Sequence, residues 1–308
     1  MCPLISRRFP DFIIAIFSLV VFFPAAVFAN AQDAKDAGGL QVVTTLFPTY
    51  DFAKQVGKDK VNVSLLLPPG IEAHAFEPKP SDIVKINKAD IFIYTGKYME
   101  PWVEDALKGV SNRNLLVVDA SAGIEIAVKD GCRDPHIWLD LGNAQVMVER
   151  IAKALARKDP ANSDFYSSNA REYNTRLAAL DKRFKETLSG CRQKTLIYGG
   201  HSAFGYFARR YGLRHDSPYA GFSPDAEPTP KAIAKLVDKI RQSGMKHVFH
   251  EELLDPKVAR TIASETGAHL MLLHGAHNVS RDELKNGATF LQFMEEDLDK
   301  LKIGLECK

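Results

Sequence analysis

Residues 163–189 read SDFYSSNAREYNTRLAALDKRFKETLS, and this stretch decides how the chain is organised. It contains neither glycine nor proline, and residues that can face a core recur at steps of three or four: Phe165, Asn169, Tyr173, Leu177, Leu180, Phe184 and Leu188. This spacing predicts one amphipathic helix of roughly 27 residues, about 40 Å long at about 1.5 Å per residue. The alternative is two helices with a break, but no breaker residue marks one. A single helix of this length can span two lobes and hold them at a nearly fixed angle.

The segments on both sides of this helix alternate between two kinds of pattern. β-Branched and apolar runs predict strands at 41–47, 60–68, 89–96, 114–121, 194–200, 214–220, 247–252 and 269–274. Helical spacing falls between them at 50–56, 81–88, 203–211, 230–243, 256–267 and 285–302. Strands that alternate with helices indicate parallel sheets. The sequence therefore predicts an α/β fold of two lobes, each with a parallel sheet flanked by helices and joined by the long helix. We place the N-terminal lobe at 40–160, the linking helix at 161–190 and the C-terminal lobe at 191–308.

The first residues have the pattern of an export signal. Two arginines precede an apolar run at 12–28, and small residues follow it up to Ala31. This pattern predicts a cleaved signal peptide over 1–31, then a flexible leader over 32–39, and a periplasmic protein. An uncleaved membrane anchor is the alternative, and Pro24 argues against it because it interrupts the run. The letters SRRF also resemble a twin-arginine signal, so general secretion and twin-arginine export both stay open.

The composition excludes some classes of function. The chain has 308 residues, of which 45% are hydrophobic and 25% charged, with a formal net charge of +2. These values are ordinary for a globular protein of two domains. They give no sign of a nucleic-acid surface or of a strongly acidic partner.

The cysteines fit an oxidising compartment. The mature chain keeps Cys132, Cys191 and Cys307, and no C-x-x-C motif is present, so a thiolate metal site is not expected. Cys191 precedes the first strand of the second lobe, and Cys307 follows the last helix, which should run antiparallel to the strands. Both should lie at the same pole, which favours a Cys191–Cys307 disulfide.

Four of the nine histidines fall where α/β proteins bind ligands. His74 follows the second predicted strand by a short loop, and His201 directly follows the first strand of the second lobe. His274 closes the last predicted strand, and His136 lies in the segment DPHIWLD (134–140) after the last strand of the first lobe. Open parallel sheets bind ligands beyond the carboxyl ends of their strands. If the lobes face each other, the four imidazoles converge on one cleft.

Imidazoles in such a group suit a borderline transition metal. Zinc accepts neutral imidazole in tetrahedral sites. Copper, nickel and iron also accept imidazole, whereas calcium and magnesium prefer oxygen ligands. Around His136, Pro135 stiffens the backbone and Trp138 can pack beside the site. Asp140 is either an acceptor for an imidazole N–H or a helix N-cap. We expect core or surface roles for four other histidines: His215, His247, His250 and His269.

Four longer segments carry a resemblance to a known family. They are GIEAHAFEPKPSDIVKINKADIFIYTG (70–96), DPHIWLD (134–140), GGHSAFGYFARRYGL (199–213) and EPTPKAIAKLVDKIRQSGMKHVFHEE (227–252). Together they resemble the metal-binding solute-binding proteins of bacterial ATP-binding-cassette importers, in the zinc-uptake branch, over about residues 40–305. The resemblance implies metal bound between the lobes, with His74, His136 and His201 as three ligands. Manganese-binding relatives carry a glutamate at the third position, so His201 favours Zn²⁺ over Mn²⁺ or Fe²⁺.

The sequence departs from the family pattern at two places. Many relatives have an aspartate at the end of the last strand, whereas LLHGAHN (272–278) offers His274 here. The fourth ligand is therefore open between His274, a water molecule, Glu251 and His277, with His274 as the first choice. The histidine-rich loop of many zinc relatives is also absent, because residues 122–133 contain no histidine.

The resemblance implies a function without catalysis. We expect high-affinity binding of Zn²⁺ outside the inner membrane and delivery to a membrane permease with a separate ATPase subunit. The absence of a G-x-x-x-x-G-K-[ST] motif fits this division, and we expect a monomer. The alternatives are a Mn- or Fe-binding member of the family and a secreted zinc-dependent hydrolase that uses Glu251 as base. HEELL (250–254) lacks the second histidine of a metalloprotease motif, and Phe204 replaces a glycine of a nucleophile elbow. A secondary adhesive role stays open.

Overall fold

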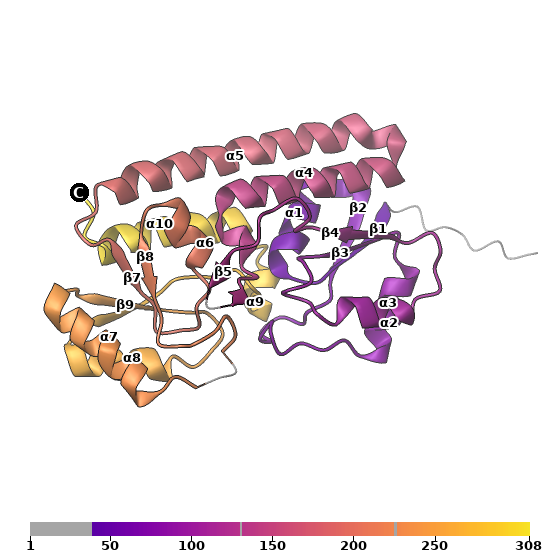
Figure 1. Ribbon diagram of the computed structural model, residues 1–308. Helices are drawn as coiled ribbons and strands as arrows, with labels where there is room; N and C mark the ends of the chain where they lie inside the picture. The colour runs from indigo at the N-terminus through magenta and orange to yellow at the C-terminus, as the bar shows by residue number, and fades with distance from the viewer. Residues whose placement is uncertain (1–38, 130, 225–226) are drawn as a thin grey trace, which may run out of the picture. The chain divides into compact units, whose positions relative to one another are not determined.

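A parallel sheet of four strands forms the first lobe (Figure 1). The computed structural model describes residues 39–308 except 130 and 225–226, so the predicted signal peptide lies outside the described residues. The strand order is β2-β1-β3-β4, and the strands are β1 (Leu40–Thr44), β2 (Val61–Leu65), β3 (Ile91–Tyr94) and β4 (Leu116–Asp119). The central strands are buried almost throughout, as in sheets covered on both faces.

The second lobe has two parallel strand pairs that meet at one bridge. β7 (Thr195–Ile197) pairs with β8 (Arg214–Asp216), and β9 (His247–His250) pairs with β10 (His269–Leu272). A bridge between Tyr198 and Phe249 joins β7 to β9. The order is therefore β8-β7-β9-β10, and β10 lies at the edge.

The long helix predicted from the sequence is present. α5 (Ser163–Ser189) has 27 residues and runs alongside α4 (Leu141–Lys158) across the tops of both sheets in Figure 1. Asp140 caps α4, because its carboxylate accepts hydrogen bonds from the backbone N–H groups of Gly142 and Asn143. The predicted fold class, two α/β lobes joined by one long helix, is confirmed.

One continuous hydrophobic core joins the two lobes. Its buried side chains come from the first sheet, α4, α5, the second lobe and α10 (Phe290–Gly304). Asp51 of α1 (Phe47–Gly57) reinforces this connection, since it accepts hydrogen bonds from the Tyr173 hydroxyl (3.1 Å) and from the Phe290 N–H (3.0 Å). Two smaller hydrophobic clusters pack against the sheets, one in each lobe. Much of the core is therefore common to both lobes.

Arg210 ties the second lobe to both long helices. From α6 (Gly205–Arg210) its guanidinium donates to both carboxylate oxygens of Asp181 on α5, at 2.6 and 2.8 Å, and to Asp140 at 2.7 Å. Burial opposes ionisation of Asp181, but hydrogen bonds from Arg210, Lys185 and Tyr211 outweigh it and lower the pKa to about 2. This bidentate pairing stiffens the connection between the lobes.

The C-terminal region differs from the prediction of one helix at 285–302. The structure has α9 (Arg281–Lys285) and a separate α10. Gly287 has φ 73° and ends the first helix, and Thr289 caps the second by accepting from the Gln292 N–H at 3.2 Å. A left-handed glycine followed by a capping threonine marks the break.

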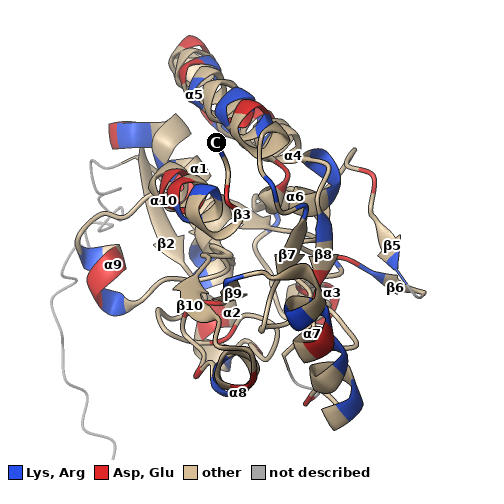
Figure 2. Cartoon of the chain, turned by 90° about the vertical axis from the view of Figure 1, so that its left-hand side faces the viewer, with Lys and Arg blue, Asp and Glu red and all other residues tan. Residues whose placement is uncertain are grey.

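The other elements complete the two lobes. The remaining helices and strands are α2 (Pro80–Lys88), α3 (Val103–Lys108), α7 (Pro230–Ser243), α8 (Lys257–Thr266), the β5–β6 hairpin (Val128–Lys129 and Cys132–Arg133), and 3₁₀ turns at Lys58–Lys60, Ile137–Leu139 and Pro160–Asn162. Figure 2 shows lysine, arginine and acidic residues interspersed along α5 and α7, in line with the net charge of +2. Within the described part of the chain, no helix combines the length and apolar character needed to cross a membrane.

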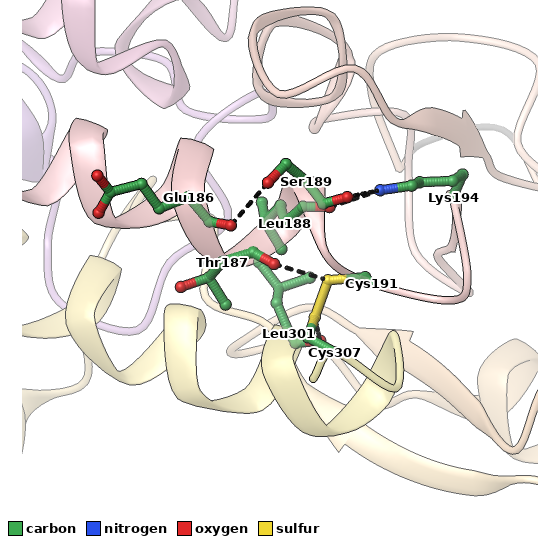
Figure 3. Close-up of a disulfide and its surroundings, with 8 residues drawn as sticks. All are labelled: Glu186, Thr187, Leu188, Ser189, Cys191, Lys194, Leu301 and Cys307. Carbon is green, nitrogen blue, oxygen red and sulfur yellow. Dashed lines mark hydrogen bonds between the residues drawn. A yellow bond between two sulfur atoms is a disulfide. The ribbon is translucent and has the colours of Figure 1, made fainter.

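A disulfide joins Cys191 to Cys307, as the sequence predicted. It links the segment after α5 to the segment after α10, and Figure 3 shows these two segments side by side. Nearby, Lys194 donates to the carbonyl oxygens of Leu188 and Ser189 at the end of α5, where a cation satisfies unpaired carbonyl groups. Cys132 is exposed and free.

Candidate metal centre

Four imidazole rings converge between the two lobes. One ring nitrogen from each of His74, His136, His201 and His277 lies within 4.8 Å of all the others. His136 Nε2 is 3.2 Å from His74 Nε2 and 3.3 Å from His201 Nε2. Two nitrogens bound tetrahedrally to one zinc ion at about 2.0–2.1 Å lie about 3.3–3.4 Å apart. The two distances around His136 therefore match those between ligands of one tetrahedral zinc ion.

The fold brings these rings together from the carboxyl ends of strands. His74 lies in the loop after β2, His201 just after β7, and His277 in the loop after β10. His136 precedes the 3₁₀ turn that leads into α4. The rings of His136, His201 and His277 are buried, whereas His74 is half-buried. Both lobes thus contribute to one site, as strand-end placement predicted.

Each of the three buried rings is held by its own carboxylate. The distances from ring Nδ1 to carboxylate oxygen are 2.8 Å for His136–Asp134, 2.5 Å for His201–Glu251 and 3.2 Å for His277–Glu252. A ring that donates its Nδ1–H to a carboxylate keeps a lone pair on Nε2, which is the tautomer a metal requires. These partners therefore orient three rings toward the same point.

Backbone N–H groups hold the three carboxylates in turn. Asp134 accepts from the N–H of His136 at 3.0 Å, and Glu251 accepts from the N–H of His201 at 3.2 Å. Glu252 accepts from the N–H of Gly275 at 2.7 Å. The orienting groups are thus fixed by the same loops that carry the histidines.

The protonation of the rings suits metal binding near neutral pH. Burial, together with neighbouring imidazoles, holds the pKa values of His74 and His136 well below the usual value of 6.5. Burial also acts against charge on His277, but its hydrogen bond and proximity to Glu252 prevail and raise its pKa. Burial raises the pKa of Asp134 to about 7. Of His74, His136 and His277, therefore, His277 is the ring that a proton occupies first as the pH falls.

His274, the first choice for fourth ligand, lies outside this group. Its ring stacks on Phe293 with centroids 3.8 Å apart, and its Nδ1 accepts from the Ala276 N–H at 2.9 Å. Ala276 has φ 54°, so the chain turns sharply and delivers His277 in place of His274. The Nε2 atoms of both rings are buried without a hydrogen-bond partner, so it is position that separates the two residues: His277, and not His274, lies with the other three rings. The spacing H-G-A-H holds both candidates, and the turn between them decides which faces the site.

The frame around His136 is partly as predicted. Trp138 packs beside the site, with its ring 5.5 Å from His136 and 5.2 Å from His277, and its Nε1 donates to the Gly275 carbonyl at 2.8 Å. The imidazole acceptor is Asp134 and not Asp140, which serves as the N-cap of α4. Asp134 lies only two residues before the ring, but the spacing of the sequence pointed to Asp140.

A cavity of about 550 Å³ opens beside the loop that carries His74. Its walls include Glu72 and Ala75 from that loop and Gly200 and Glu251 from the second lobe. Acidic side chains favour the approach of a cation. The cavity is thus bordered by neighbours of His74 in its loop and by Glu251, the carboxylate that holds the His201 ring.

Comparisons with known proteins agree with this geometry. The family model described as zinc-uptake complex component A periplasmic matches residues 42–304. The high-affinity zinc uptake system protein ZnuA of Bacillus subtilis is 37% identical over 297 residues, which cover 91% of this chain and 92% of that protein.

Two solved structures are similar in sequence and fold. The metal-dependent lipoprotein YcdH of Bacillus subtilis is 39% identical, with a TM-score of 0.76 over 86% of this chain and 99% of that one. The Zn(II)-bound ZnuA-like domain of Streptococcus pneumoniae AdcA is 33% identical, with a TM-score of 0.76 over 87% of this chain and 100% of that one. The chain therefore belongs to the zinc-uptake component A family, the zinc-binding solute-binding proteins of ATP-binding-cassette importers.

Proposed function

We propose that the Nε2 atoms of His74, His136, His201 and His277 hold one Zn²⁺ ion, which the protein carries to its membrane permease. The observation that supports this assignment is the spacing of the ring nitrogens, 3.2 and 3.3 Å around His136, with all four nitrogens within 4.8 Å. Zinc is the cargo, so the site has to bind it tightly and also release it.

The donor set favours zinc over harder cations. Neutral imidazoles suit zinc, whereas manganese, calcium and magnesium take carboxylate, carbonyl and water oxygens more readily. Four protein ligands also complete a tetrahedral shell, so no position stays open for a reactive water molecule. Glu251, the candidate base of a hydrolase, is engaged with the ring and N–H of His201. The site therefore supports carriage of the ion and not hydrolysis.

The protein works as a monomer in the periplasm after removal of residues 1–31. A single chain supplies all four ligands, which supports a monomer. The export pattern that ends at Ala31 and the family's periplasmic description support the location. Intact mass of the exported protein checks the cleavage, and light scattering on a sizing column checks the monomer. A lipid-modified N-terminus or a stable dimer would contradict these assignments.

The experiment that tests the ligand set is isothermal titration of chelator-treated protein with zinc. We expect one tight equivalent per chain, and His277→Ala should weaken it by about a thousandfold or more, because a buried ligand is lost. The matched variant His274→Asn should keep the tight equivalent, since that ring packs on Phe293 outside the cluster. Tight binding that survives His277→Ala but not His274→Asn would overturn the assignment.

A further inference from the structure

A second pair of histidines lies at the opposite end of the second sheet. His247 begins β9 and His269 begins β10, and the two residues are direct partners in the parallel register. The four-histidine site collects residues from the carboxyl ends of strands, so this pair is at the other pole of the lobe. His269 is exposed on the edge strand, and His247 is half-buried.

The two rings have a separation that suits a shared metal ion. Their centroids are 5.8 Å apart with planes inclined at 47°. In the four-histidine cluster the centroid separations are 4.9 Å for His136–His277 and 5.9 Å for His74–His277. The outer pair therefore falls within the range that the metal centre itself displays. His247 Nδ1 is buried without a hydrogen-bond partner.

The carboxylate of Glu306 lies near enough to His247 to act on it electrostatically. Phe249 is two residues after His247 on the same face of the sheet, and Gly304 of α10 lies against its ring. Glu306 follows α10, so the chain brings it to the end of the sheet where His247 begins. One oxygen of Glu306 pairs with Arg192 at 2.7 Å, and the other, Oε1, is buried without a partner. The negative charge of Glu306 acts on His247, although burial dominates and lowers the pKa of that ring.

We propose that His247 and His269, with the carboxylate of Glu306 as neighbour, form a second site for a borderline divalent ion such as Zn²⁺, Ni²⁺ or Cu²⁺. Two imidazoles on adjacent strands can chelate such an ion, and the unpaired oxygen of Glu306 supplies a charge of opposite sign. This site is separate from the four-histidine cluster and shares no residue with it.

The outer site should bind more weakly than the inner one. It has fewer ring ligands, one of its rings is exposed, and Arg192 competes for the carboxylate. Within the described residues, neither ring has a carboxylate hydrogen-bonded to it, and such partners are typically worth about 10–100-fold in affinity. We expect a dissociation constant at least about 100-fold weaker than that of the inner site.

The test is a calorimetric titration with zinc alone. Full-length mature protein that already holds one equivalent is titrated with further zinc near neutral pH, and a second, weaker equivalent is expected. The double variant His247→Gln/His269→Gln should lose the second equivalent and keep the first, which also shows that it is folded. Lys246→Gln is the matched control: it changes the same exposed surface without removing a ligand, and it should keep both equivalents.

The two proposals fail independently. A double variant His136→Ala/His201→Ala should lose the first equivalent and retain the second, while Glu306→Gln should weaken only the second, by several-fold. If the wild-type protein takes up one equivalent only, or if His247→Gln/His269→Gln still takes up two, the outer site is wrong. Neither result would affect the inner assignment, which rests on the first equivalent.

Discussion

His74 and the other three clustered histidines are built differently. His136, His201 and His277 are buried, and each has a carboxylate on its Nδ1. His74 lies on a loop, is half-buried, and its ring has no carboxylate hydrogen-bonded to it in the described part of the chain. Three rings, which we call the half-shell, are thus oriented by carboxylates of the protein itself, and the fourth ring depends on the conformation of its loop.

This difference suggests how tight binding and release can coexist. Oriented ligands give affinity because little entropy is lost when they bind. A ligand on a loop beside a cavity can leave first and let the ion follow. We therefore expect the loop that carries His74, and not a wide movement of the lobes, to control exchange of the ion.

Removing a ligand gives the largest expected effect. His201→Ala should weaken zinc binding by about a thousandfold or more, whereas His74→Ala should cost about 10–100-fold, because the remaining half-shell stays oriented. Competition with a chelator of known affinity measures both values. Equal losses of affinity in the two variants would show that His74 and His201 do not differ in the way proposed here.

Removing an orienting carboxylate should have a smaller effect. Glu251→Gln should weaken zinc binding by about 10–100-fold, because the His201 ring loses the acceptor that fixes its tautomer. The control is Glu72→Gln, on the same loop as His74, where the carboxylate accepts from the Ala75 N–H and from no ligand ring. It should change the affinity by less than about threefold. A larger loss in the control than in Glu251→Gln would reverse the comparison.

The pH dependence of zinc affinity should reflect the three rings that carboxylates hold. The pKa of His277 is raised, so above it the ring is neutral and below it zinc must displace a proton. Affinity should be fully developed above that pKa and fall as pH decreases through it, by up to about tenfold per pH unit for each proton displaced. Burial raises the pKa of Asp134 to about 7, so protonation of this carboxylate should add to the loss of affinity as the pH falls through that value. Titrations between about pH 5 and 8 measure this slope, and an affinity that is flat across neutrality contradicts it.

Hydrogen exchange should show the smallest and most local effect. Zinc should slow amide exchange in the loop that carries His74, since the ion ties that loop to the second lobe. The segment from His136 to Trp138 is already buried and should change little. Mass spectrometry of peptides from the free and loaded protein separates the two regions. A larger change at His136 than at His74 would indicate that the half-shell is not preformed.

The sequence sufficed for features that depend on local pattern. The long helix was predictable because 27 residues keep one apolar stripe without a breaker. His74, His136 and His201 lie together, as their places after strands predicted, and their role as ligands stays a prediction. The disulfide followed from the expected pole of Cys191 and Cys307.

Other features depend on side-chain direction after a turn. His274 and His277 are three residues apart, and a left-handed residue at Ala276 decides which ring enters the site. Asp134 and Asp140 flank His136, and one binds the ring while the other caps a helix and receives Arg210. Spacing alone does not separate such alternatives, because both members of each pair are chemically suitable.

The core that runs from the first sheet through α5 to α10 has a consequence for folding. Two domains with separate interiors can melt one after the other, but lobes that share buried side chains lose them together. The mature protein should therefore denature in a single calorimetric transition, and neither lobe should be obtainable as a stable fragment. Because buried side chains of α10 belong to the same core as those of the first sheet, the first lobe lacks part of its interior until α10 has been made.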